Sequence, residues 1–123
     1  MSKKILIVDD APIVRLMLKD IIEYHGYEVV GEGNNGQEGV DMFKELKPDL
    51  VTMDIIMPEK DGIEALEEIL KINPDAKVVM VTAIDQRESL MKAIRLGATD
   101  YIVKPFENDR VISAVTKAFG DSQ

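Results

Sequence analysis

The chain has 123 residues, and its 15 Lys and Arg residues against 23 Asp and Glu residues give a formal net charge of −8. This length suits one domain, expected over residues 1–123, and the absence of Cys excludes disulfides, thiolate metal sites and a cysteine nucleophile. The acidic balance argues against a nucleic-acid partner. No apolar run approaches the roughly 20 residues of a membrane span, and Met1–Lys4 does not lead into a secretory signal. We therefore expect a cytoplasmic protein without a membrane partner.

The first half of the chain predicts two strand–helix pairs. Ile5–Val8 is short, apolar and rich in β-branched residues, which is typical of a strand, and a weaker run lies at Val29–Val30. Between them a helix is expected to begin near Pro12 and to end near Gly26. Its apolar face is predicted to consist of Ile13, Leu16, Met17, Ile21 and Tyr24. A second helix, with Val40, Phe43 and Leu46, should end before Pro48.

The second half predicts three further pairs. The strands are expected at Leu50–Met53, Val78–Val81 and Tyr101–Val103. The helix after the first of them carries Ile63, Leu66, Ile69 and Leu70 and should close at Asn73–Pro74. The next helix is expected to begin with a capping box of Asp85 and Glu88 and to end at Gly97. The last helix carries Val111, Val115 and Phe119.

Five strand–helix pairs in about 120 residues predict an α/β fold, (βα)5, with a doubly wound parallel five-stranded sheet. The strand runs are nearly continuous in apolar residues rather than alternating, as a parallel sheet covered on both faces requires. In such sheets ligands bind beyond the carboxyl ends of the strands. The residues directly after each apolar run are therefore the candidates for a functional site.

Three carboxylates follow two of these runs: Asp9 and Asp10 after the first, and Asp54 after the third. Thr82 ends the fourth run and Lys104 follows the fifth. Each could have a purely structural role, because Asp is common at strand ends and helix N-caps and Thr is common in strands. The segment after the second run, Glu32-Gly33-Asn34, is expected to be a solvated loop.

If the first, third, fourth and fifth strands are neighbours, these side chains meet at one edge of the sheet. Three carboxylates with one ammonium then leave uncompensated charge, and two carboxylates about 5 Å apart repel by about 3 kcal/mol at an effective dielectric constant of about 20. Oxygen ligands of this kind favour Mg²⁺, with Mn²⁺ or Ca²⁺ as alternatives. A carboxylate beside such a cation and Lys104 can accept a phosphoryl group, with Thr82 donating to a phosphoryl oxygen.

From about Lys3 to Phe119 the chain resembles response-regulator receiver domains of two-component signalling, and most of all the stand-alone chemotaxis members. Each matching segment is weak by itself, but all of them in this order and spacing are specific. The segments are Ile5–Asp10, Met53–Pro58 with Asp61–Gly62, Val81–Ala83, Gly97–Ala98 and Lys104–Phe106. The resemblance implies a flavodoxin-like fold with strand order 2-1-3-4-5.

The resemblance also implies how the cation and the phosphoryl group are held. Asp54 would be the phosphoacceptor and a ligand of Mg²⁺. Asp10 would bind Mg²⁺ directly, Asp9 mostly through water, and Ile56 through its backbone carbonyl. Lys104 would pair with the phosphoryl group and precede a cis bond to Pro105.

The same resemblance implies a switch. Thr82 would move toward the phosphate and Tyr101 would turn inward behind it, remodelling the face where partners bind. Ile56 and Ile84 depart from the polar residues that are commoner at these two positions in the family. Because polar side chains there can help to place the hydrolytic water, we predict a comparatively long-lived aspartyl phosphate.

The predicted function is that of a single-domain response regulator, a signalling protein that catalyses only its own phosphorylation and dephosphorylation. We expect it to be a monomer. Its donor would be a sensor histidine kinase, CheA-like in a chemotaxis system, and its target a flagellar motor switch component or an adaptor. The alternative is a phosphorelay intermediate that passes the phosphoryl group to a second histidine protein. Two other classes remain as alternatives, but the sequence disfavours them. A phosphate-ester hydrolase that forms an aspartyl phosphate usually carries a second Asp at the position of Ile56. A flavin-binding protein of this fold is expected to have a Ser/Thr/Gly-rich loop at the position of Asp9 and Asp10.

Overall fold

The structure is a computed structural model that describes residues 3–120. Strands and helices alternate along the whole of this range, so the predicted (βα)5 order is confirmed. The strands are β1 (Lys4–Val8), β2 (Glu28–Gly33), β3 (Leu50–Asp54), β4 (Val78–Ala83) and β5 (Asp100–Lys104). The helices are α1 (Pro12–Tyr24), α2 (Gly36–Leu46), α3 (Gly62–Ile72), α4 (Arg87–Leu96) and α5 (Asn108–Ala118).

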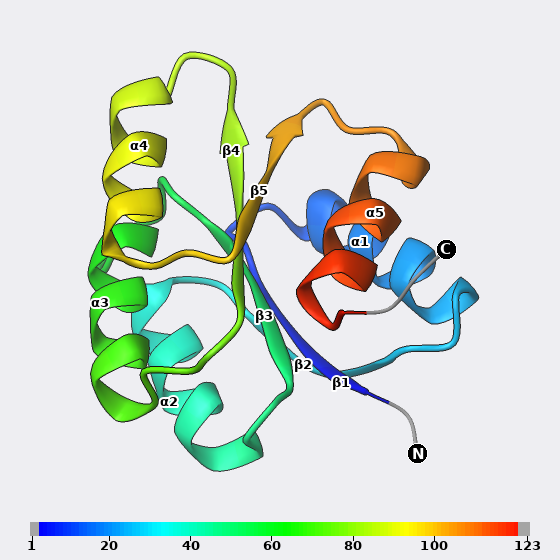
Figure 1. Cartoon of the computed structure of the whole chain (residues 1–123), viewed down its shortest axis with the longest axis horizontal. Coiled ribbons are helices and arrows are strands. Elements are labelled where there is room, and N and C mark those ends of the chain that lie inside the picture. The colour runs from blue at the N-terminus through cyan, green and yellow to red at the C-terminus, as the bar shows by residue number, and fades with distance from the viewer. Residues whose placement is uncertain (1–2, 121–123) are drawn as a thin grey trace.

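All five strands lie in one parallel sheet with the order β2-β1-β3-β4-β5, as the resemblance implied. Helices cover both faces: α2, α3 and α4 lie on one side of the sheet, and α1 and α5 on the other (Figure 1). The chain places β2 on one side of β1 and then crosses back to place β3 on the other side of β1. This arrangement brings the carboxyl ends of β1 and β3 next to each other.

The core has two halves because successive side chains of a strand point to opposite faces of the sheet. In β1, Leu6 and Val8 pack with the residues of α2 and α3, whereas Ile5 and Ile7 pack with those of α1 and α5. All four side chains are buried. Burial on both faces explains why the strand runs in the sequence are continuous rather than alternating.

The predicted apolar face of α1 is largely wrong. Ile13, Leu16 and Met17 are 63%, 53% and 44% exposed, and Tyr24 is exposed as well. Of the expected residues only Ile21 is buried, and it packs with a different stripe of the helix. That stripe consists of Val14, Leu18, Ile21 and Ile22. α1 is apolar on two sides, so helical spacing alone did not identify the side that contacts the sheet.

The start of α4 also differs from the sequence prediction. The helix begins at Arg87 with Gln86 as its N-cap, and no side chain caps it, so the capping box expected from Asp85 and Glu88 is wrong. A capping box is present instead at the start of α3, where Asp61 accepts from the backbone N–H of Glu64 and Glu64 accepts from that of Asp61. None of the helices within residues 3–120 combines the length and apolar character needed to cross a bilayer.

Candidate functional site

Four neighbouring strands end at the same edge of the sheet, and each delivers one predicted site residue there. Asp54 is the last residue of β3, Lys104 is the last residue of β5, and Thr82 is the penultimate residue of β4. Asp9 directly follows β1. The sequence prediction that these residues converge depended on the strand order, which the structure confirms.

Lys104 connects the two buried carboxylates. Its Nζ atom lies 3.0 Å from Asp9 Oδ2 and 3.3 Å from Asp54 Oδ2. The side chains of Asp9 and Asp54 are 1% and 10% exposed, so little water screens these ion pairs. Ion pairing at such short range holds both carboxylates and the ammonium in fixed positions.

Asp9, Asp10 and Asp54 form an acidic cluster in which one oxygen from each carboxylate lies within 4.8 Å of the others. Two unit charges at that distance repel by about 3.5 kcal/mol at an effective dielectric constant of about 20. Lys104 brings one positive charge to three carboxylates, so the repulsion is only partly compensated. Asp9 Oδ2 is buried, and within the described residues it has no hydrogen bond beyond its ion pair with Lys104. Asp10 is exposed, which opens the cluster to solvent. The donor set therefore fits a hydrated divalent cation with oxygen ligands.

The ionisation of Asp54 reflects this crowding. Burial, followed by the negative charge of Asp9, raises the pKa of Asp54 to about 6, although Lys104 and the backbone N–H of Ile55 act in the opposite direction. For Lys104, burial lowers the pKa, but the hydrogen bonds and charges of Asp9 and Asp54 outweigh it and the pKa is raised overall. Lys104 is therefore charged at neutral pH, and Asp54 is mostly ionised.

Two backbone contacts fix the position of Asp54. The N–H of Ile55 donates to Asp54 Oδ1 at 2.8 Å, which leaves Oδ2 toward Lys104 and the acidic cluster. The N–H of Gly62, at the start of α3, donates to the carbonyl of Ile55 at 2.8 Å. A Cβ atom at position 62 would lie 2.0 Å from the Asp54 carbonyl oxygen, so only glycine permits this approach of α3 to the end of β3.

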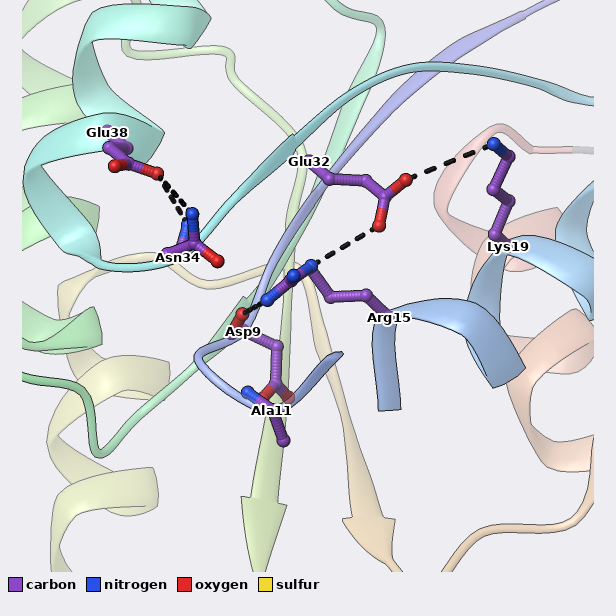
Figure 2. A network of polar contacts seen from close by, with 7 residues as sticks. All are labelled: Asp9, Ala11, Arg15, Lys19, Glu32, Asn34 and Glu38. Carbon is purple, nitrogen blue, oxygen red and sulfur yellow. Dashed lines mark hydrogen bonds and ion pairs between the residues drawn. The ribbon is translucent and has the colours of Figure 1, made fainter. Parts of the chain in front are cut away.

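A polar network of Asp9, Arg15 and Glu32 holds the connection between β1 and α1 (Figure 2). Asp9 Oδ1 accepts from the N–H of Ala11 at 2.9 Å, and the Asp9 N–H donates to the carbonyl of Gly33 at 3.0 Å. Arg15 Nη1 donates to the carbonyl of Asp9 at 2.6 Å, and Arg15 Nε donates to Glu32 Oε1 at 3.2 Å. Glu32 and Gly33 are the last two residues of β2, and Glu32 contacts Arg15. The solvated loop predicted to begin at Glu32 is therefore wrong for these two residues. The sequence prediction did not include Arg15.

The two residues expected to switch differ in exposure. Thr82 is buried, and its hydroxyl donates to the carbonyl of Ala83 at 3.1 Å. Tyr101 is 40% exposed, with the guanidinium of Arg110 lying 5.6 Å from its ring centroid. Arg110 also donates to the carbonyl of Tyr101 at 2.5 Å. The arginine was not predicted from the sequence, because nothing in the spacing of α5 indicates a contact with β5.

Ile56 and Ile84 lie in the loops that follow two of these strands. Ile56 follows β3 and is 57% exposed, and Ile84 follows β4 and is 83% exposed. The peptide bond between Lys104 and Pro105 is cis, as the resemblance implied.

Comparison with known proteins agrees with this geometry. A family model described as the response regulator receiver domain matches residues 5–116. The chain belongs to this family. The chemotaxis protein CheY of Thermotoga maritima is 56% identical to this receiver domain over 117 residues, which cover 95% of this chain and 98% of that protein. CheY of Bacillus subtilis is 52% identical, with the same coverage of both chains.

A solved structure with the same fold is that of a CheX–CheY–BeF3–Mg²⁺ complex from Borrelia burgdorferi. One of its chains matches this receiver domain with a TM-score of 0.90 and 31% identity, covering 95% of this chain and 89% of that one. Receiver domains are signalling proteins that accept a phosphoryl group and bind Mg²⁺ at an acidic pocket, and this one is a CheY-like chemotaxis response regulator. The acidic cluster of Asp9, Asp10 and Asp54 fits that pocket in its donor atoms.

Proposed function

We propose that this receiver domain accepts a phosphoryl group on Asp54 from the phosphohistidine of a sensor kinase. The observation that carries the proposal is the position of the Asp54 carboxylate, held between Lys104 and the two carboxylates of the β1–α1 connection. A buried carboxylate with one fixed oxygen and a neighbouring ammonium is arranged to act as a nucleophile toward phosphorus. Its Oδ2 atom would form the new bond to phosphorus while the P–N bond breaks and its electron pair returns to the imidazole ring.

The chain's own residues have separate parts in this transfer. Lys104 would keep its contact with Asp9 and pair with a phosphoryl oxygen, and the hydroxyl of Thr82 would donate to another. Asp10 and Asp54, the backbone carbonyl of Ile56, and Asp9 through water would hold the cation. When bound, Mg²⁺, or Mn²⁺ in its place, would supply positive charge beside the transferring group.

The output of the domain would be a change in the face formed by α4, β5 and α5. Movement of Thr82 toward the phosphate leaves space behind it, and Tyr101 would turn inward into that space. The proposed donor is a CheA-like sensor histidine kinase, and the proposed target is a flagellar motor switch component or an adaptor. The chemotaxis relatives and the Borrelia structure, in which a CheY is in complex with CheX, support a protein target.

The proposal is tested by incubating the protein with Mg²⁺ and acetyl phosphate and measuring its intact mass. We expect a gain of one phosphoryl group that disappears when Mg²⁺ is chelated and that Asp54→Asn does not show. Loss of the group to water would support the response regulator. Rapid transfer to a second histidine protein would support the phosphorelay intermediate instead, and steady turnover of phosphate monoesters would contradict both.

A further inference from the structure

The β1–α1 connection carries two of the three clustered carboxylates, and most of the polar contacts that hold it are made by Asp9. Its last residue, Ala11, is the N-cap of α1 and provides no side-chain hydrogen bond, and Pro12 follows at the first helical position. Asp10 is exposed. The direction of the backbone at Asp9 therefore determines where the carboxylates of Asp9 and Asp10 can lie.

Arg15 reaches back from the first turn of α1 and fixes that backbone (Figure 2). Its Nη1 atom donates to the Asp9 carbonyl at 2.6 Å, and its Nε atom donates to Glu32 Oε1 at 3.2 Å. The Arg15 side chain is only 14% exposed. Glu32 belongs to β2, where it pairs with Ile7 of β1. Since a guanidinium is planar and rigid, its anchorage on the sheet sets the position of the donor that holds Asp9.

The contact of Arg15 with the β1–α1 connection is made at a backbone carbonyl and not at a carboxylate oxygen of the cluster. Arg15 binds a backbone carbonyl, whereas Lys104 binds the carboxylates of Asp9 and Asp54 directly. The charge of Arg15 is also opposed by Glu32 beside it. Lys104 therefore neutralises charge within the cluster, whereas Arg15 contacts the backbone that carries Asp9.

We propose that Arg15 is a positioning residue for the cation site, acting through the Asp9 carbonyl and anchored by Glu32. The inference rests on the proposed function, because it assumes that the acidic cluster binds Mg²⁺. It makes a prediction opposite in sign to that of simple electrostatics. Removal of a cation near three carboxylates should strengthen Mg²⁺ binding if charge alone acts, but should weaken it if Arg15 positions the ligands.

The dissociation constant for Mg²⁺, measured by isothermal titration calorimetry, distinguishes the two. We expect Arg15→Ala to weaken Mg²⁺ binding at least about tenfold, as is usual when a residue that orients metal ligands is lost. Arg15→Lys keeps the charge but not the planar fork, so it should restore only part of the affinity. Lys19→Ala is the matched control, because Lys19 Nζ lies 3.9 Å from Glu32 Oε2 and approaches Glu32 from the side away from Asp9 (Figure 2). The Mg²⁺ affinity of Lys19→Ala should stay within about twofold of that of wild type.

A second readout separates positioning from chemistry. With acetyl phosphate as donor, Arg15→Ala should raise the Mg²⁺ concentration that gives half-maximal phosphorylation, while the rate at saturating Mg²⁺ stays near that of wild type. If circular dichroism shows that Arg15→Ala is unfolded, Arg15→Lys gives the comparison. Because this variant keeps the positive charge, charge alone predicts unchanged Mg²⁺ binding, whereas the positioning role predicts weaker binding.

The possible results separate this inference from the proposed function. Equal or tighter Mg²⁺ binding by the Arg15 variants, with normal binding by wild type, would overturn the inference and leave the proposed function standing. A wild-type protein that binds no Mg²⁺ would overturn both.

Discussion

Asp54→Asn should make the Mg²⁺-free protein more stable, although it removes the proposed nucleophile. The pKa of Asp54 is about 6 in the folded protein, against an ordinary value of 3.8 for this side chain. At about 1.36 kcal/mol per pH unit, ionised Asp54 destabilises the folded state by up to about 3 kcal/mol at pH 8. The side chain is 10% exposed, so solvent screening reduces this figure only modestly. Because Asn leaves Lys104 with one carboxylate partner fewer, we expect a net gain of about 1–3 kcal/mol.

The pH dependence has a definite sign. An acid whose pKa is raised on folding binds its proton more tightly in the folded state, so its stabilising contribution is present below pH 3.8 and is lost as the pH rises through about 6. The advantage of Asp54→Asn over wild type should therefore be greatest at pH 8. It should fall to roughly half by pH 5 and below about 1 kcal/mol by pH 4.

Urea unfolding at several pH values, with Mg²⁺ chelated, measures this difference. Asp75→Asn, a change at an exposed loop residue, is the control and should alter stability by less than about 0.5 kcal/mol at every pH. Addition of Mg²⁺ should stabilise wild type more than Asp54→Asn, since wild type keeps all three carboxylates. If Asp54→Asn were less stable than wild type at pH 8 without Mg²⁺, the electrostatic account of the cluster would be wrong.

Three further variants test other parts of the site. Lys104→Met should raise the pKa of Asp54 above 6, because burial and the neighbouring carboxylate would then act without the opposing ammonium; ¹³C NMR titration of the carboxyl carbon measures it, and an unchanged pKa would contradict the role of the ion pair. Ile56→Asn combined with Ile84→Glu should shorten the lifetime of the aspartyl phosphate, since polar side chains at these two exposed positions can help to place the hydrolytic water; equal rates of phosphate release from variant and wild type would count against this hypothesis. Gly62→Ala should lower the free energy of unfolding by more than about 2 kcal/mol and reduce phosphorylation, because its Cβ would overlap the Asp54 carbonyl; a stable, fully active variant would show that α3 can move away.

The sequence predicted the sheet and the acidic cluster for the same physical reason. Buried parallel strands must be continuously apolar, so their ends are visible in the sequence, and the first polar residue after each strand must lie at the ligand-binding edge. Asp9, Asp54 and Lys104 were all found in this way, and the structure brings them together. The strand order itself came from the family resemblance rather than from the pattern of apolar residues.

Contacts that depend on packing between elements could not be predicted in this way. α1 has apolar residues on two sides, and only docking on the sheet determines that Leu18 and Ile22, rather than Leu16 and Met17, are buried. The contact between Arg15 and Glu32 joins two residues that are 17 positions apart and lie in different elements, so no local spacing marks it. The one signal available was a pair of opposite charges, one early in the first helix and one near the end of the second strand.

Chemical trapping of the phosphorylated residue tests the central claim most directly. Borohydride reduces an acyl phosphate to an alcohol, so aspartyl phosphate becomes homoserine and can be located by mass spectrometry of peptides. After incubation with Mg²⁺ and acetyl phosphate, homoserine should be found at position 54, and Asp9 and Asp10 should remain aspartate. Homoserine at position 9 or 10, or an unmodified Asp54 in protein that has gained phosphate, would contradict the account.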